Sequence, residues 1–278
     1  MVAALTSPSR ARALLREHGL TPDKGFGQNF LVDAAVLRAI VGAAAIDGAD
    51  TVLEVGPGLG ALTIELAQRA ERVVSVELDR RLLPVLADTL AGTSNVELVQ
   101  GDAAAFDFAI LPAGSLLVAN LPYNVATAVV TRALASGRFA RLVFLVQREV
   151  AERMTARPST PAFGALTLVV AHFGSARIVR NVPPGVFLPP PKVTSSVVRI
   201  DVHPDARPDP ALFALIHQGF AHRRKTLVKN LIMAGYPRER AERALAQLGL
   251  DPRVRAEALE LARFEALLRA LRGEDGAG

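Results

Sequence analysis

The feature that most restricts the fold is the alternation of short apolar runs with helix-like stretches in the first half of the chain. The runs are rich in aliphatic and β-branched residues, and they are Thr51–Val55, Arg72–Glu77, Val96–Gln100, Ser115–Asn120 and Arg141–Gln147. Between them, helical apolar spacing is clearest at Ala61–Arg69 and Arg81–Leu90. Strands that alternate with helices form parallel sheets with right-handed crossovers. We therefore expect an α/β fold with a doubly wound, Rossmann-like sheet that binds ligands at the carboxyl ends of its strands.

The pattern changes after Val202, where the polar, proline-rich sequence HPDARPDP interrupts the chain. Before this break, residues 178–200 indicate two further strands joined by a proline-rich loop that cannot be helical. After it, helical spacing returns at Leu212–Phe220, Arg238–Leu248 and Ala256–Leu271. These shifts predict a ligand-binding domain over residues 1–202 and a small helical domain over residues 203–278.

The composition excludes several classes of site. The chain has 278 residues and no cysteine, which excludes disulfides, cysteine-ligated zinc and thiol catalysis. Its 5 histidines lack metal-ligand spacing, so no metal is expected. No apolar run reaches the roughly 18 residues of a membrane span, and charges occupy the first twenty positions, where a signal peptide needs an apolar stretch. We expect a soluble, cytoplasmic, monomeric protein with no membrane partner.

Charge is distributed unevenly along the chain. The net charge is +5 overall, but residues 31–131 carry −7 and residues 132–200 carry +8. This asymmetry favours a protein with one side for a small molecule and another for a polyanion. A solvated surface without any partner would give the same pattern, so composition leaves both interpretations open.

A glycine-rich loop follows the first predicted strand, in the sequence TVLEVGPGLGALT. Gly56, Gly58 and Gly60 are spaced G-x-G-x-G, with Glu54 just before them. A dinucleotide site uses G-x-G-x-x-G, whose third glycine packs the helix that binds a pyrophosphate. S-adenosylmethionine has no pyrophosphate, and its ammonium group suits a nearby carboxylate. The loop favours S-adenosylmethionine over a nicotinamide cofactor, although a glycine loop by itself is a weak signal.

Two further acidic residues stand at predicted strand ends. Glu77 ends the second strand, where a carboxylate accepts hydrogen bonds from both ribose hydroxyls of a nucleoside. Asp102 follows the third strand and is placed to accept from an adenine amino group, with Leu78 or Ala103 beside the ring. The alternative for Asp102 is an ordinary helix N-cap. Three elements in the expected order favour the cofactor interpretation.

Asn120-Leu121-Pro122-Tyr123 follows the fourth strand and is the most diagnostic motif of the chain. An adenine amino group is a poor nucleophile, so methylation needs acceptors that bind its hydrogens and aim its lone pair. The Asn120 side-chain oxygen and the Leu121 carbonyl are suitable acceptors, and Pro122 has no N–H to compete with them. Tyr123 is suited to stack on a base taken out of its helix. The alternative is a simple turn.

With these motifs, residues 10–272 resemble the rRNA adenine-N6,N6-dimethyltransferase family, and within it the enzymes that act on 16S rRNA. The matching segments are GFGQNFL (25–31), LEVGPGLGALT (53–63), VELD (76–79), QGDA (100–103), NLPYN (120–124), VQREVAERM (146–154), FLPPPKVTSSV (187–197) and HRRKTL (222–227). The resemblance implies a class I methyltransferase sheet. It implies cofactor contacts from Asn29, Leu31, Gly56, Glu77, Asp102 and Asn120, with Gln28 beside them.

The resemblance also assigns roles that the residue pattern alone does not. The GFGQNFL segment would fold over the cofactor as a partial lid, with Asn29 bonded to the methionyl end. Phe187 would stack on the target base opposite Tyr123, unless it only fills the core. Arg148 and Arg153, on a helix after the fifth strand, resemble phosphate contacts, and a solvated helix face is the alternative.

The helical domain contributes a compact cationic cluster, consisting of Arg223, Arg224, Lys225 and Lys229. Such a cluster favours phosphate binding, because each neutralised phosphate releases counterions. A solvated helix face is again the alternative. The implied partner is 16S rRNA in an immature 30S particle, modified at two adjacent adenines near its 3′ end.

Three other functions compete with this interpretation. A related resistance enzyme methylates adenine in 23S rRNA and usually has NIPY or NIPF at the acceptor motif, whereas this chain has NLPYN. A non-catalytic assembly or transcription factor would not require Glu77, Asp102 and Asn120, all of which are intact. A nicotinamide-dependent oxidoreductase would bind NAD rather than S-adenosylhomocysteine.

Overall fold

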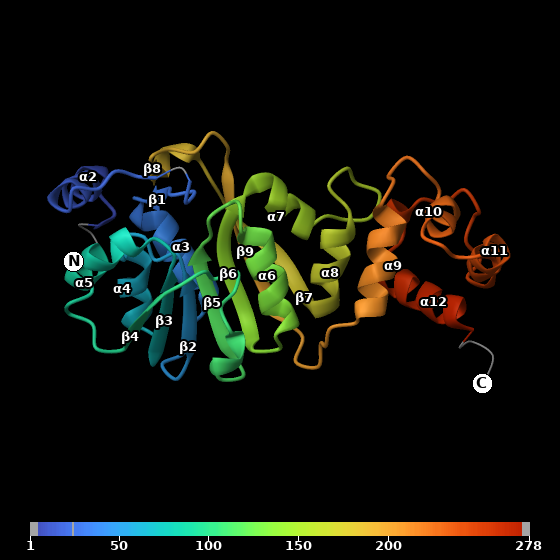
Figure 1. Cartoon of the computed structure of the whole chain (residues 1–278), viewed down its shortest axis with the longest axis horizontal. Coiled ribbons are helices and arrows are strands. Elements are labelled where there is room, and N and C mark those ends of the chain that lie inside the picture. The colour runs from blue at the N-terminus through green and yellow to red at the C-terminus, as the bar shows by residue number, and fades with distance from the viewer. Residues whose placement is uncertain (1–4, 24, 274–278) are drawn as a thin grey trace. The chain divides into compact units, whose positions relative to one another are not determined.

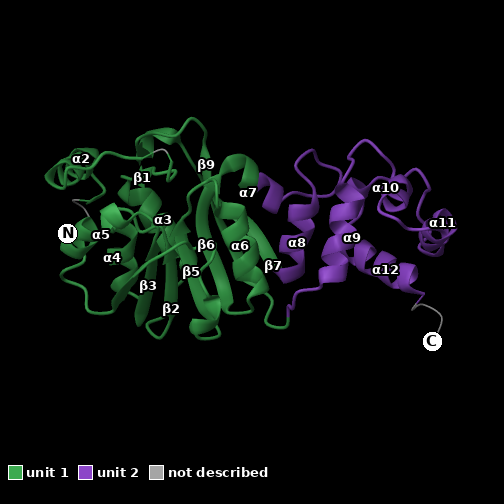
Figure 2. Ribbon diagram, viewed as in Figure 1, with its two compact units in different colours: residues 1–151, 174–205 green, residues 152–173, 206–278 purple. Residues whose placement is uncertain are grey.

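The computed structural model describes residues 5–23 and 25–273. These residues form two compact units, shown in Figure 2. The first contains the described residues up to 151 together with residues 174–205, and the second contains residues 152–173 together with those from 206 onwards. The outermost residues of both predicted domains, 1–4 and 274–278, lie outside the described residues.

The first unit is built on a sheet of seven strands in the order β4-β3-β2-β5-β6-β9-β7, visible in Figure 1. Their bounds are β2 (Thr51–Val55), β3 (Arg72–Glu77), β4 (Val96–Gln100), β5 (Ser115–Asn120), β6 (Phe139–Gln147), β7 (Gly174–Val182) and β9 (Ser195–Val202). Strands β4, β3, β2, β5 and β6 are parallel to one another. Strand β9 runs antiparallel to both β6 and β7. The predicted doubly wound α/β sheet is therefore confirmed.

Both faces of the central strands are buried. Adjacent residues of a strand point to opposite faces, and in β2 and β3 the pairs Val52–Leu53 and Val73–Val74 are fully inaccessible to solvent. The helices of this unit are α2 (Pro8–Glu17), α3 (Ala34–Ala44), α4 (Ala61–Ala67), α5 (Leu83–Thr89) and α6 (Ala126–Ala135), with short 3₁₀ turns η1 (Arg80–Leu82), η2 (Phe108–Ile110) and η3 (Pro184–Val186). The helix predicted at Arg81–Leu90 is divided, because Pro84 has no N–H and starts a new helix at α5.

Two strands of only two residues each form a small separate sheet. In this sheet β1 (Phe30–Leu31) pairs antiparallel with β8 (Phe187–Leu188), and the Val32 N–H continues the pairing by donating to the Val186 carbonyl at 2.8 Å. The sequence did not predict this sheet, since a two-residue strand has no detectable period. The pairing fastens the segment before α3 to the proline-rich loop before β9.

The second unit consists of helices around their own apolar core. They are α8 (Ala165–Phe173), α9 (Pro210–Phe220), α10 (Leu227–Met233), α11 (Arg238–Gln247) and α12 (Leu261–Arg272), with the 3₁₀ turn η4 (Ala256–Ala258). Phe163 and Leu168 belong to the same buried cluster as Leu215 and Phe264. Residues 152–173, which the sequence assigned to the first domain, therefore pack with the C-terminal helices.

The link between the units at residue 205 lies close to the predicted break after Val202. Helix α7 (Arg148–Met154) contains the other division, after Ala151. Among the described residues, no helix combines the length and apolarity needed to cross a membrane.

Candidate functional site

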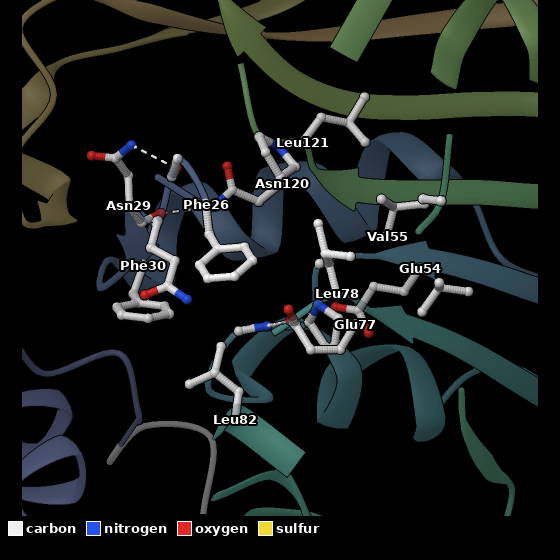
Figure 3. Close-up of a pocket in the computed structure, with 18 of the residues that line it drawn as sticks. Phe26, Asn29, Phe30, Glu54, Val55, Glu77, Leu78, Leu82, Asn120 and Leu121 are labelled. Atoms are coloured by element: carbon white, nitrogen blue, oxygen red, sulfur yellow. Dashed lines mark hydrogen bonds between the residues drawn. The ribbon is translucent and has the colours of Figure 1, made fainter. Parts of the chain in front are cut away.

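One cavity of the first unit lies where strands β2, β3, β4 and β5 end, beneath the segment that precedes α3 (Figure 3). Thirteen residues proposed from the sequence line it: Gln28, Asn29, Leu31, Gly56, Gly58, Glu77, Leu78, Asp102, Ala103, Asn120, Leu121, Pro122 and Tyr123. Figure 3 shows Phe26, Asn29 and Phe30 across the cavity from Glu77 and Leu78. The sheet topology thus brings together residues that are about a hundred positions apart in sequence.

The glycine loop after β2 brings its backbone close to the cavity. Gly58 and Gly60 have φ angles of 59° and 86°, in the left-handed region where side chains are disfavoured. A Cβ at Gly58 would lie 3.0 Å from the Phe30 ring, and one at Gly60 would lie 2.9 Å from the Thr89 hydroxyl. Any larger residue would push into these neighbours. Gly58 thus keeps the loop thin beside the cavity, whereas Gly60, which does not line it, lets the loop pack closely on α5.

Glu77 is held in place by the backbone around it. One carboxylate oxygen accepts the Asp79 N–H at 2.8 Å, and the other lies 3.4 Å from the Gly58 N–H. The residue is only 6% exposed, and this burial raises the pKa of its carboxyl group while the backbone N–H groups oppose the rise. Glu77 is therefore an oriented acceptor at the end of β3.

Glu54 is the more deeply buried of the two glutamates at this edge. It is 1% exposed and accepts a 2.7 Å hydrogen bond from the Ser75 hydroxyl. Burial is the largest cause that raises the pKa of Glu54, to about 7. A group with this pKa changes charge near neutral pH, so Glu54 is not a constant negative charge beside the cavity.

Leu78 and Asp102 provide an apolar surface and an acceptor on neighbouring strand ends. Leu78 is 47% exposed, unusually open for a large apolar side chain, and it lines the cavity. One oxygen of Asp102 accepts the Ala104 N–H at 2.8 Å. The turn at Asp102 leads into no helix, so Asp102 is not a helix N-cap, and this bond uses only one of its two oxygens.

The amide of Asn120 is oriented by the segment before α3. Its nitrogen donates to the Asn29 carbonyl at 3.1 Å, so the oxygen remains as the group that can accept from another donor. The turn that follows is closed by hydrogen bonds from the Val125 and Ala126 N–H groups to the Pro122 carbonyl, at 3.2 and 3.1 Å. The motif is thus a turn, as the alternative stated, and its residues also line the cavity.

Tyr123 is fixed through its hydroxyl group. The phenol lies 2.6 Å from the hydroxyl of Ser195, a fully buried residue at the start of β9. Burial raises the pKa of Tyr123, so the phenol stays neutral. Ser195 lies within the matching segment FLPPPKVTSSV (187–197), but its pairing with Tyr123 was not predicted, because the two residues are 72 positions apart.

A polar network fastens the segment around Gln28 to the end of β3. The Gln28 amide donates to Asp79 at 2.8 Å, and its oxygen accepts the Asp23 N–H at 2.8 Å. Arg81 bonds to both Asp79 and Asp23, at 2.8 and 2.9 Å. The Arg81 hydrogen bond is the largest cause that lowers the pKa of Asp79, which therefore stays ionised. Sequence reasoning overlooked Asp79 and Arg81, for which the VELD motif was the available signal.

Other predicted residues do not line this cavity. Phe187 is 3% exposed and packs in the core, with Leu31 as its strand partner. Arg148 and Arg153 are exposed on α7. The residues of the cationic cluster, Arg223, Arg224, Lys225 and Lys229, are all exposed. Arg223 also donates to the Pro161 carbonyl at 2.8 Å and pairs with Glu257 at 3.5 Å.

Comparison with known proteins identifies the family. The model of the family "Ribosomal RNA adenine dimethylase" matches residues 20–271. A relative from Deinococcus radiodurans, "Ribosomal RNA small subunit methyltransferase A", is 48% identical over 270 residues, which are 97% of this chain and 92% of the relative. The chain belongs to the ribosomal RNA adenine dimethylase family. The predicted family and enzyme class are thereby confirmed.

Solved structures of similar proteins agree with this assignment. A dimethyladenosine transferase from Plasmodium falciparum has a TM-score of 0.78 and 27% identity, over 88% of this chain and 98% of that one. The 23S rRNA methyltransferase ErmE has a TM-score of 0.70 and 27% identity, over 88% and 100% of the two chains. Methyltransferases of this family take their methyl group from S-adenosylmethionine.

Proposed function

We propose that this dimethylase transfers methyl groups from S-adenosyl-L-methionine to the 6-amino groups of two adjacent adenines near the 3′ end of 16S rRNA. The substrate would be an immature 30S particle, and the protein would act as a monomer in the cytoplasm, where small subunits are assembled. The observation that carries the proposal is Asn120, whose amide nitrogen is committed to the Asn29 carbonyl and whose oxygen remains for an incoming amine.

The residues around the cavity fit the cofactor. Gly56 and Gly58 line the cavity without side chains, so the loop backbone can be approached closely by a ligand. Glu77 would accept from the ribose hydroxyls, Asp102 from the adenine amino group, and Leu78 would cover one face of the adenine. The cofactor supplies a methyl group on a positively charged sulfur and leaves as S-adenosyl-L-homocysteine.

The acceptor loop would hold the target amine in line with that methyl group. The Asn120 oxygen and the Leu121 carbonyl accept the two amine hydrogens, which aims the nitrogen lone pair. Pro122 keeps the loop in its turn, and Tyr123 stacks on the base. The proton becomes acidic once the nitrogen is alkylated, so it passes to solvent without a dedicated base.

Phe187 would complete the base site only after a rearrangement, because it is now packed against the segment that carries Leu31. The β1–β8 pair connects this segment to the proline-rich loop. Movement of the loop would therefore also move Phe30 and Leu31, which line the cofactor cavity. This role of Phe187 remains a prediction.

Cationic residues would bind the phosphates around the target. Arg148, Arg153, Arg224, Lys225 and Lys229 are exposed, as a phosphate contact requires. Arg223 already has two partners within the second unit, so we propose that it shapes the cluster as well as contributing charge. No metal is needed for this chemistry, since positioning and charge stabilisation act directly on the amine.

The experiment that tests the function uses labelled methyl donor and 30S particles from a methylation-deficient strain. Digestion and mass spectrometry should show dimethyladenine at two adjacent positions near the 3′ end of 16S rRNA. Naked 16S rRNA and 23S rRNA are the parallel substrates. Modification of 23S rRNA alone would replace the proposal with the resistance-type function, for which the likeness to ErmE is the specific observation.

The cofactor assignment has a separate and simpler test. S-adenosylhomocysteine should raise the melting temperature of the protein, because a ligand that binds only the folded state stabilises it. NAD should leave it unchanged. A shift with NAD and none with S-adenosylhomocysteine would exclude the proposed cofactor.

A further inference from the structure

Arg132 makes three contacts with the loop that carries Asp102. It lies on α6, and its guanidinium donates to the Ala103 carbonyl at 3.1 Å and to the Phe106 carbonyl at 3.0 Å. The same group lies over the Phe108 ring, 5.0 Å from its centre. A planar guanidinium suits these two carbonyls and this ring, because its N–H groups spread in a fixed fork while its face stacks on an aromatic ring.

The groups that Arg132 contacts are themselves held in place by packing and by hydrogen bonds. Phe108 is 4% exposed and packs edge-on against Phe139 of β6, with ring centres 5.4 Å apart. The loop is also closed from within, since Asp102 accepts from the Ala104 N–H through its side chain and from the Ala105 N–H through its carbonyl. Arg132 therefore joins this closed turn to a helix outside it.

The helix that carries Arg132 starts at the acceptor motif. Helix α6 begins at Ala126, whose N–H donates to the Pro122 carbonyl. One rigid element thus holds the acceptor loop at its first residue and the Asp102 loop through Arg132. The sequence pattern had placed Arg132 at the start of the basic segment of residues 132–200, but its contacts are with protein carbonyls.

We propose that Arg132 is a positioning residue that sets the place of Asp102 and so determines recognition of the adenine of the cofactor. This inference rests on the proposed binding of S-adenosylmethionine in the cavity. A hydrogen bond from the adenine amino group to Asp102 requires the carboxylate within a few tenths of an ångström of its proper place. Without Arg132, the loop keeps its internal turn but loses its fixed distance from α6.

The test compares S-adenosylhomocysteine with S-inosylhomocysteine, in which oxygen replaces the amino group. The full chain should bind the adenine compound at least about tenfold more tightly, because a site built for an amino group rejects an analogue that lacks it. In Arg132→Met, which keeps the length but has no donor, affinity for the adenine compound should fall about tenfold. Affinity for the inosine compound should change less than about twofold, so the discrimination is lost.

Two further variants complete the experiment. Arg138→Met removes the same charge six positions along and should behave like the parent. Arg138 lines a surface hollow together with Arg132 and Phe108, but the hydrogen bonds to the Ala103 and Phe106 carbonyls come from Arg132. Arg132→Lys keeps the charge with a single ammonium and should give an intermediate ratio, and it serves as the test variant if Arg132→Met does not fold.

The outcomes separate the inference from the function on which it rests. Equal weakening of both compounds by Arg132→Met would reduce Arg132 to a structural contact, and unchanged affinities would also overturn the inference. A parent protein that binds neither compound would overturn the proposed cofactor together with the inference. Selective loss of the adenine compound in the variant supports both.

Discussion

The cavity of the first unit and the cationic surface of the second are organised by different means. At the cavity, Glu77 is buried and oriented by backbone N–H groups, and Asn120 is oriented by the Asn29 carbonyl. On the second unit, Arg224 and Lys225 are exposed side chains. Methyl transfer requires acceptors fixed to fractions of an ångström, whereas attraction to phosphate tolerates long, mobile side chains. Precise geometry is thus concentrated where chemistry is proposed.

The largest effect is expected at Asn120, because the difference between the cavity and the cationic surface depends most on its fixed geometry. Asn120→Ala removes the acceptor that would act while positive charge builds on the amine, so turnover should fall about 10²- to 10³-fold with RNA binding nearly unchanged. Mass spectrometry of digested rRNA measures turnover and should show monomethyladenine enriched over dimethyladenine. Asn95→Ala, just before β4 and so at the opposite end of that strand from the cavity, is the control. Dimethylation by folded Asn120→Ala at the parental rate would reduce the motif to a turn.

A somewhat smaller effect is expected for Glu77→Ala. Two ribose hydroxyls would lose a charge-assisted acceptor, which costs about 1.5–3 kcal/mol of cofactor binding. Calorimetry with S-adenosylhomocysteine measures the loss. Glu97→Ala removes an exposed glutamate that pairs with Arg72 and should leave the affinity unchanged. If both variants bind like the parent, Glu77 only caps its strand.

The third prediction concerns the pH dependence of stability and the buried Glu54. Its pKa rises from 4.5 to about 7 on folding, so the folded state holds an extra proton between these values. The contribution of neutral Glu54 to the free energy of unfolding is therefore complete below pH 4.5, and it is lost as the pH rises through 7. Between roughly pH 5.5 and 8 this amounts to about 2 kcal/mol. Urea unfolding should show this loss in the parent and not in Glu54→Gln.

The control for this prediction lies on the surface of the same unit. Glu97→Gln should retain the parental pH dependence, since Glu97 is half exposed. A Glu54→Gln profile parallel to the parent would mean that the buried carboxylate stays charged across this range.

The smallest effect is expected on the second unit, where the cationic side chains are exposed and each contributes little by itself. Arg224→Glu combined with Lys225→Glu should weaken RNA binding about tenfold at physiological salt and flatten its dependence on salt, with cofactor affinity unchanged. Arg223→Glu sharpens the comparison, because it also loses contacts with Pro161 and Glu257 and should lower the melting temperature of the protein. Equal salt slopes for the double variant and the parent would contradict RNA binding here.

The charge pattern of the sequence was informative but overstated the number of cations available to RNA. Within the basic segment of residues 132–200, Arg132 is exposed but donates to two carbonyls of the Asp102 loop. Arg141 and Arg199 donate to the Ala44 and Ala43 carbonyls at the end of α3, at 2.8 and 2.9 Å. Formal charge does not distinguish a guanidinium that binds carbonyls from one that faces solvent, and only the packing of helices on the sheet makes that distinction.

Local chemistry made much of this protein predictable from its sequence. Strand β3 was delimited correctly because the β-branched, apolar residues Val73, Val74 and Val76 lead to a carboxylate at Glu77. The loop at Gly58 was recognisable because its glycine spacing is short-range. The parallel, doubly wound arrangement then followed from the general rules of crossover connections, and with it the placing of Glu77, Asp102 and Asn120 at the carboxyl ends of their strands. The order of the strands came only from the structure.

Contacts between residues distant in the sequence were decided only by the tertiary structure. The bonds of Gln28 with Asp79 and of Tyr123 with Ser195 join positions 51 and 72 residues apart, and no periodicity within either segment encodes them. The same holds for the packing of residues 152–173 with the C-terminal helices and for the burial of Phe187. A sequence determines what each segment prefers to be, because sterics and local hydrogen bonding act over a few residues. Which surfaces pack together depends on how the apolar side chains of the whole chain are buried against one another. That is decided only when the complete chain folds.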